Sequence, residues 1–463
     1  MFNPDIQYRC TIIRGKAQKE LDNLLPAYAH IVADICPSEK DVFDDNFNNR
    51  LSNIIYNRKF DELDENNQKT IRNHITEIAG KLFGLFYFKD GYIYESESTK
   101  KLLEDNDQPA FFKNLCLNFQ FPNGTQKIQT VIERIEDRIK FKPFHFVLAI
   151  LNSAELKNIT LTKDEISFYV LNAKQVLQGS ITVEEVLKEI LKDRENHIIK
   201  KIESGSFHNQ HIREQLNLLI LANLILFDAD LVRLNQAESD LIKKFISELK
   251  KPLDFDIYKY DLGSDEGKKT MYSDWSEYFS KVAVKNYELI STTIEALQRV
   301  VIEKSIPIKK GIDHTILGDE GEEFVFALEK SRVRLTHPRL VNKVLLLGNQ
   351  RGLGYDISSV EANENIEEPE FARFIEVKAT KRITEPNLDD TTWVDTVNLT
   401  RKEWIAAKQY RTAYNIYRVY FTPSATIVRK INDPFSKNEN GLITVLPTLY
   451  RMDFGSKSID KQY

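Results

Sequence analysis

The chain has 463 residues, 42% hydrophobic and 29% charged, which is too long for one hydrophobic core, so we expect two to four domains. Its formal net charge of −5 argues against a protein that coats nucleic acid through a general excess of Lys and Arg, because such binding depends on cations displacing counterions from phosphates. A site built from carboxylates would itself contribute to this negative charge.

The cysteines and the apolar runs indicate the cellular compartment in which the protein is expected. Cys10, Cys36 and Cys116 are an odd number without a CxxC spacing, so they predict neither a disulfide framework nor a zinc ribbon. There is no run of 18 apolar residues, and the first residues lack the basic and apolar regions of a secretory signal. We therefore expect a cytoplasmic protein that does not associate with a membrane.

The first region, residues 1–140, is predicted to be mostly helical. Apolar residues recur every three or four positions over about 16–33 and 68–85, which predicts two amphipathic helices. Two β-prone runs follow in 85–94 and are joined at Asp90-Gly91, a strong hairpin signal. Helix, helix and hairpin in this order predict a winged-helix-like domain.

A second helical or winged-helix-like domain, for DNA binding or as a linker, is predicted over 141–265. Thr162 with Glu165, and Thr182 with Glu185, are capping boxes, and the second should open a helix that continues to about 202. The apolar stretch 212–227 indicates a buried helix or a passage from helix to strand. A linker region is expected over 266–311, with a helix from about 273 to 305.

The residues suited to chemistry lie in the last predicted domain, 312–463. Residues 318–328 open a helix with acids in its first turn, and 343–347 is a strand-like run. Asp356 follows a glycine turn, and Glu376 and Lys378 occur in an alternating strand, whose period of two places them on one face. A face with these two charges cannot be a buried apolar one.

This set of residues suits hydrolysis of a phosphodiester bond. Mg²⁺ takes few protein carboxylates and keeps waters, one of which becomes the nucleophile, and a nearby lysine orients that water or offsets charge on the phosphate. Downstream, Thr400 and Glu403 form a further capping box at the start of a helix, and 416–421 is strand-like.

The ordered motifs GxxGEE, GxGYDI and FIEVKAT resemble the PD-(D/E)XK nuclease superfamily, and over about 312–435 they look like the C-terminal domain first named from the NO VEIN protein. The resemblance implies an α/β core with a mixed sheet flanked by helices. It also implies Mg²⁺, with Mn²⁺ able to substitute. Tyr355 stands where the superfamily name has proline. Carried over by position, Asp356 and Glu376 bind metal and Lys378 is the catalytic lysine. Glu322 is then a helix acid that reaches the metal through water, with Glu320 or Glu323 as alternatives. In the helix that follows the core, the residues that could meet phosphates are Lys402, Lys408 and Arg411.

The N-terminal half resembles the recognition region of AlwI-type restriction enzymes. The resemblance is spread over about 5–200 and is carried by Thr11–Lys16, Asn73–Ile78, Lys101–Asp105 and Phe119–Gly124. Such enzymes read a short asymmetric site and cut a few bases away. The resemblance implies a type IIS-like enzyme that has double-stranded DNA as its partner and a separately encoded cognate methyltransferase. We also expect a transient homodimer on DNA, because one catalytic core cannot break both strands at once.

Other interpretations stay open at this stage. Glu376 and Lys378 could be a solvated pair on an edge strand, and the acids at 320–323 could simply favour the helix dipole at an N-terminus. The first functional hypothesis is a sequence-specific type II restriction endonuclease that acts against foreign DNA. The alternative is a DNA-sensing or modification-dependent defence subunit whose nuclease core acts only in a larger assembly. A nuclease selective for junctions or RNA is a third, weaker hypothesis.

Overall fold

The computed structural model describes residues 18–202, 207–281, 287–298, 317–348, 353–363, 367–390, 393–446 and 450–462. The chain divides into two compact units. Unit 1 comprises residues 1–103 and 108–296, and unit 2 comprises 104–107 and 297–463. The sequence-predicted boundary at 140/141 falls inside unit 1 and stays a prediction, and the segment Thr11–Lys16 lies outside the described residues.

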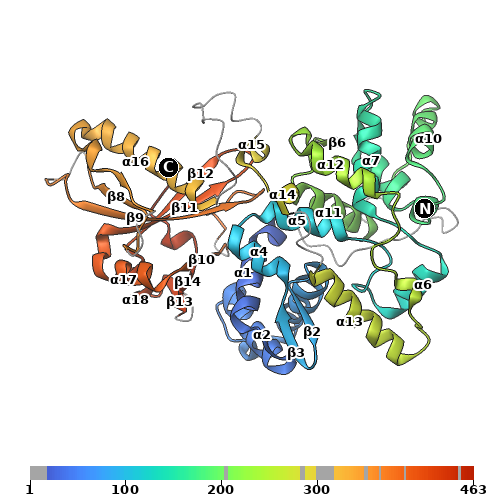
Figure 1. Ribbon diagram of the computed structural model, residues 1–463, viewed down its shortest axis with the longest axis horizontal. Coiled ribbons are helices and arrows are strands. Elements are labelled where there is room, and N and C mark those ends of the chain that lie inside the picture. The colour runs from blue at the N-terminus through green and yellow to red at the C-terminus, as the bar shows by residue number, and fades with distance from the viewer. Residues whose placement is uncertain are drawn as a thin grey trace. The chain divides into compact units, whose positions relative to one another are not determined.

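Unit 1 begins with helices around a small antiparallel sheet (Figure 1). Strand β1 (Ser38–Glu39) pairs with β3 (Tyr92–Glu95), which pairs with β2 (Phe86–Lys89). Asp90 and Gly91 both have positive φ, 49° and 87°, as a tight hairpin turn requires, so the predicted hairpin is confirmed. The helical elements are α1 (Gln18–Ile35), α2 (Lys40–Tyr56), η1 (Phe60–Glu62), α3 (Glu65–Asn73), the π-helix η2 (His74–Leu82), α4 (Glu97–Asp105), α5 (Gln108–Asn118), α6 (Ile128–Glu136) and α7 (Pro143–Glu155).

The second half of unit 1 repeats this pattern. Strand β4 (Leu161–Thr162) pairs with β6 (Leu231–Leu234), which pairs with β5 (Ile225–Asp228). The stretch predicted as a helix or a helix-to-strand passage is α11 (Phe207–Leu221) followed by β5. The other helical elements are α8 (Lys163–Glu165), the π-helix η3 (Ile166–Leu171), α9 (Lys174–Leu177), α10 (Val183–Glu195), η4 (Gln236–Glu238), α12 (Ser239–Glu248), η5 (Ile257–Lys259), α13 (Asp265–Lys281), α14 (Tyr287–Ile290) and α15 (Ile294–Leu297).

Two helix lengths predicted for this region are wrong. Helix α10 begins after its Thr182 capping box as predicted, but it ends at Glu195 rather than near 202, because His197 adopts a left-handed conformation with φ 53°. The second wrong prediction is a single helix over 273–305. The described residues of that range do not form one continuous helix. Helix α13 begins earlier, at Asp265, and the non-helical residues 291–293 separate α14 from α15.

A buried ion pair links distant segments of unit 1. The Lys113 side chain on α5 is fully buried, and its Nζ lies 2.7 Å from Glu238 Oε1 and 2.9 Å from Thr292 Oγ1. Breaking a buried pair leaves one charge uncompensated in a low dielectric, which costs about 3–5 kcal/mol. Lys113 therefore connects α5 to two segments that each lie more than a hundred residues further along the chain.

Unit 2 is built on a mixed six-stranded sheet. The strand order is β15 (Lys461–Gln462), β12 (Thr426–Asn432), β11 (Tyr414–Phe421), β9 (Ala372–Lys381), β8 (Ile357–Val360) and β7 (Leu345–Leu346). Strands β11 and β9 are parallel, and the other neighbours in the sheet are antiparallel. This mixed sheet agrees with the α/β fold class expected for the C-terminal domain.

Helices cover both faces of this sheet (Figure 1). Helix α16 (Leu317–Thr336) lies on one face, where Gly321 packs directly against Ala379. Helices α17 (Arg401–Tyr410) and α18 (Pro434–Glu439) lie on the opposite face. A second antiparallel sheet, in the order β10 (Asp395–Leu399), β14 (Tyr450–Phe454) and β13 (Ile443–Leu446), packs on that side too. The remaining 3-10 turns are η7 (Pro338–Lys343), η8 (Arg411–Ala413) and η9 (Ser456–Ser458).

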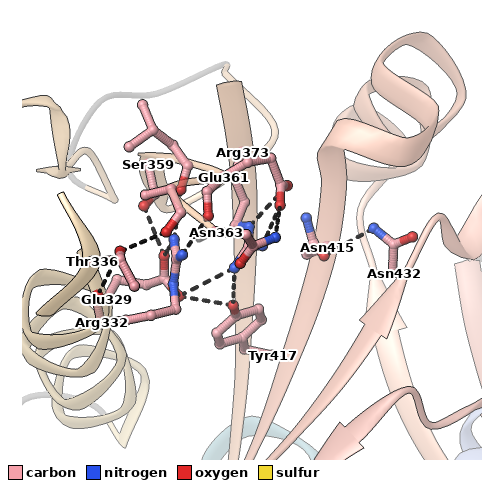
Figure 2. Close-up of polar contacts among 12 residues, drawn as sticks. Glu329, Arg332, Thr336, Ser359, Glu361, Asn363, Arg373, Asn415, Tyr417 and Asn432 are labelled. Carbon is pink, nitrogen blue, oxygen red and sulfur yellow. Dashed lines mark hydrogen bonds and ion pairs between the residues drawn. The ribbon is translucent and has the colours of Figure 1, made fainter. Parts of the chain in front are cut away.

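A buried polar network fastens α16 to the sheet (Figure 2). Glu329 on α16 is fully buried, and it accepts hydrogen bonds from Arg332 at 3.0 and 2.7 Å and from Tyr417 Oη at 2.8 Å. Arg373 on β9 lies 3.6 Å from Glu329 and forms two hydrogen bonds with Glu361, of 3.1 and 2.5 Å. The orientation of α16 is thus set by paired charges as well as by apolar packing.

None of the helices in the described part of the chain has the length and apolar character needed to cross a membrane.

Candidate active site

The structure brings Asp356, Glu376 and Lys378 together on neighbouring strands. Asp356 directly precedes β8, and its backbone N–H donates to Ile375 O at 2.9 Å. The Val377 N–H donates to Asp356 Oδ2 at 2.7 Å. Lys378 Nζ lies 2.6 Å from Glu376 Oε1, which confirms that the two side chains share a face.

A glycine turn aims Asp356 into this cluster. Gly354 has φ +78°, and a Cβ there would lie 2.7 Å from Lys402 O and 2.9 Å from Ala406 Cβ, so only glycine fits against α17. The buried Tyr414 hydroxyl donates to Gly354 O at 2.8 Å and holds the turn. The GYDI motif is therefore a turn that brings α17 close to the start of β8.

Burial and neighbouring carboxylates dominate the electrostatics. Burial raises the pKa of Asp356, while the Val377 N–H and Lys378 oppose the rise. Burial, Asp356 and Glu403 raise the pKa of Glu376 well above its usual value, although Lys378 opposes this. Burial alone would lower the pKa of Lys378, but Glu376 and Glu403 raise it above its usual value, so the lysine is firmly an ammonium.

Glu403 on α17 is a fourth member of the cluster that the sequence-based prediction did not include. Its Oε2 lies 3.1 Å from Lys378 Nζ, and its side chain is 13% exposed. The same residue forms the predicted capping box. Thr400 N donates to Glu403 Oε2 at 2.9 Å, and Glu403 N donates to Thr400 Oγ1 at 3.3 Å.

A second buried group braces Lys378 from β11. Arg418 lies directly opposite Lys378 in the parallel register, and its Nη1 donates to Lys378 O at 3.2 Å. Arg418 Nε donates to Asp395 Oδ2 at 2.8 Å, and Tyr420 Oη donates to the same oxygen at 2.7 Å. Burial alone would raise the pKa of Asp395, but Arg418 and Tyr420 hold it below its ordinary value. The backbone that carries the lysine is thus held from the β11 side.

The three acids at the start of α16 differ in position. The half-buried Glu322 carboxylate lies against Gly348, where any Cβ would overlap it. Glu320 Oε2 lies 3.7 Å from Lys381 Nζ, and Glu323 is exposed. Helix α16 packs on the sheet face opposite Glu376, as its contact with Ala379 shows. The choice of Glu322 over Glu320 and Glu323 as the helix acid stays a prediction.

The donor set suits a small hard cation. Asp356 and Glu376 offer carboxylate oxygens on one sheet face, and Mg²⁺ binds through one or two carboxylates plus waters. Within the described ranges, no three His, Cys, Asp or Glu side chains are placed to hold one metal ion. The two carboxylates are enough for a largely hydrated Mg²⁺, so these residues fit the expected metal.

Two of the basic residues expected near phosphates lie at the junction of α17 and α18. Arg411 Nη1 lies 2.6 Å from Glu439 Oε2, and its guanidinium lies 4.3 Å from the centre of the Phe435 ring. Lys408 Nζ lies 5.6 Å from that ring. Tyr355, the residue before Asp356, packs on Phe374 with ring centres 4.6 Å apart.

Two family models match the chain. The model described as restriction endonuclease BpuJI, N-terminal, matches residues 2–276, and the model for the C-terminal part of protein NO VEIN matches residues 321–431. The expected resemblance of the C-terminal domain to NO VEIN is confirmed. In the N-terminal half the resemblance to a restriction enzyme is confirmed, and the matching model is that of BpuJI rather than of an AlwI-type enzyme.

A solved structure is similar to part of the chain. It is described as the BpuJ1 endonuclease binding domain in complex with pyrene- and phenanthrene-modified DNA. The two chains are 49% identical with a TM-score of 0.57, and the match covers 61% of this chain and all of the other. No curated protein matches the chain.

Proposed function

This chain belongs to the restriction endonuclease family defined by the N-terminal part of BpuJI, and from that premise we propose that it is a magnesium-dependent DNA endonuclease of the PD-(D/E)XK type. The observation that carries the proposal is the convergence of Asp356, Glu376 and Lys378 on one face of a mixed sheet. This convergence occurs in the same chain as a match to the N-terminal part of a restriction endonuclease.

Unit 1 is the proposed recognition part, with winged-helix-like domains that read double-stranded DNA. The support is its similarity to a binding domain whose structure contains DNA, at 49% identity. Recognition and hydrolysis would then belong to separate compact units. An enzyme of this arrangement cuts beside the sequence that it reads, which is type IIS-like behaviour.

The proposed chemistry assigns one task to each side chain. Bound Mg²⁺ would supply an activated water and polarise the phosphate. Asp356 is held by the Val377 N–H so that its second oxygen remains available, and Glu376 presents its carboxylate on the same face. Lys378 is held as an ammonium by its carboxylate neighbours, with 22% of its side chain exposed, so it can offset charge on the phosphate in the transition state.

Two partners complete the proposal. A chain with one catalytic core needs a second copy to cut both strands at once, so we expect a transient dimer on DNA. Sedimentation of the protein with and without its cognate DNA tests this, and a monomer under all conditions would contradict it. A separately encoded methyltransferase would protect host DNA, which predicts that methylated sites resist cleavage.

The first experiment is incubation of the full chain with unmethylated and methylated plasmid and phage DNA. Each substrate is tested with Mg²⁺, with Mn²⁺ and with EDTA. Discrete fragments that require the metal and disappear in Asp356→Ala support the proposal, and sequencing their ends gives the site and the offset. DNA binding without cleavage of any substrate would contradict it and favour a defence subunit that acts only in a larger assembly.

A further inference from the structure

The ammonium of Lys378 lies between two carboxylates from different elements. Glu376 Oε1 on β9 is 2.6 Å away, and Glu403 Oε2 on α17 is 3.1 Å away. Lys378 alone is enough to balance the charge of Glu376. The second carboxylate, Glu403, therefore gives the lysine one more acidic neighbour than charge balance requires.

The Glu403 carboxylate contacts the backbone of its own helix as well as the lysine. Its carboxylate accepts the Thr400 N–H at the first turn of α17, so the start of the helix fixes its direction. Helix α17 is in turn packed against Gly354. Lys378, in contrast, has a flexible four-carbon stem and a partly exposed side chain. The lysine can therefore shift between two carboxylates while Glu403 stays in place.

The charges explain why a second partner matters. Asp356, Glu376 and Glu403 are three acidic side chains, and Lys378 Nζ lies within ion-pair distance of two of them, Glu376 and Glu403. A cation bound by Asp356 and Glu376 would compete with Lys378 for the Glu376 oxygen. Without another acceptor the lysine would either retain Glu376 and oppose the cation, or leave the site.

We propose that Glu403 is a positioning residue that takes over the Lys378 ammonium when Glu376 turns to a bound cation. The inference rests on the proposed function, since it concerns the same site. It assigns to the first turn of α17 a role in keeping the lysine beside the reacting phosphate. Glu403 acts mainly by holding Lys378 and is not itself assigned as a ligand of the cation.

The test is a double-mutant cycle on binding of Mn²⁺ to the full chain without DNA, measured by electron paramagnetic resonance. Glu403→Gln removes the charge but keeps the capping box, because glutamine serves equally well at this position. We expect it to weaken Mn²⁺ binding by about tenfold or more, since the pairing of one unit charge with the lysine over about 4 Å corresponds to as much as about a thousandfold at an effective dielectric constant of 20. In a Lys378→Met background the same change should weaken binding clearly less, because only the direct effect of the Glu403 charge on Glu376 and Asp356 remains. Glu439→Gln, which removes a surface carboxylate paired with Arg411, is the control and should have no effect.

Glu403→Asp is a second variant that keeps the charge and withdraws the carboxylate by one methylene. It should weaken Mn²⁺ binding when Lys378 is present and should have little effect in Lys378→Met. Equal losses for Glu403→Gln in both backgrounds would overturn the inference alone, because the effect would not pass through the lysine. Wild-type protein that neither binds Mn²⁺ nor cleaves DNA would overturn the proposed function, and the inference with it.

Discussion

Replacement of Glu329 by glutamine tests whether the buried network shown in Figure 2 holds α16 on the sheet. The change keeps the shape of the side chain and removes its charge. Glutamine would also place an amide N–H₂ where the carboxylate now accepts hydrogen bonds from Arg332 and Ser359. Donor would then face donor, and Arg373 would lose one of its two carboxylate neighbours.

The expected loss of stability follows from burial. Glu329 is fully buried and Arg373 is 2% exposed, so solvent screens their interaction little. Removal of one partner from a buried ion pair costs about 3–5 kcal/mol. We expect Glu329→Gln to lower the free energy of unfolding of unit 2 at pH 7 by that amount. Glu439→Gln, at an exposed pair, should cost about 1 kcal/mol or less.

Urea unfolding followed by tryptophan fluorescence measures this difference. The chain has three tryptophans, of which Trp393 and Trp404 lie in unit 2 and Trp275 lies in unit 1. In a Trp275→Phe background the signal reports unit 2 alone, which avoids treating a two-unit chain as one transition. A loss below about 1 kcal/mol for Glu329→Gln would refute the reasoning that charge pairing sets the position of α16.

The pH dependence gives a second check. Burial alone would raise the pKa of Glu329, but Arg332 and Arg373 lower it below its ordinary value. The stabilisation is therefore present above the unfolded pKa of about 4.3 and is lost as the pH falls through the lower folded pKa. The stability difference between wild type and Glu329→Gln should be constant from pH 7 down to about 5 and should shrink below about 4. A difference that stays constant to pH 3 would contradict this assignment.

Two further substitutions test other parts of the fold. Lys113→Met should destabilise unit 1 by about 3–5 kcal/mol in urea, since it leaves the partner carboxylate buried and unpaired, and a change below about 1 kcal/mol would contradict this. Gly354→Ala should cost about 2–4 kcal/mol and slow cleavage, because the added Cβ meets α17 two residues before Asp356. Gly441→Ala is the control, having φ +71° but open space around its Cβ, and it should cost about 1 kcal/mol and leave cleavage unchanged in a plasmid assay.

Local sequence signals predicted much of the fold because they act over a few residues. The turn at Asp90-Gly91 and the capping boxes at Thr162, Thr182 and Thr400 occur where the sequence indicates. The alternation at Glu376 and Lys378 placed both on one face. The C-terminal end of α10 was wrong because a left-handed residue at His197 ends the helix without glycine or proline to signal it.

The rest of the site depends on contacts between distant segments. Glu403 was predicted only as part of a capping box, and its contact with Lys378 follows from the packing of α17 against Gly354. Arg418 lies in a run predicted as a strand, but the sequence contains no sign of its register with Lys378. Such pairings depend on how the strands come together, so a single sequence does not indicate them.

The most direct test of the central claim is the single-turnover rate of DNA cleavage by wild type and Lys378→Met, measured beside the affinity for the same DNA. We predict that the rate at saturating Mg²⁺ falls by about 10²–10³ in Lys378→Met, the loss expected for one group that stabilises transition-state charge. The affinity should be unchanged, because the proposed recognition part is unit 1. Cleavage at the wild-type rate by Lys378→Met would contradict the claim that this cluster is the active site.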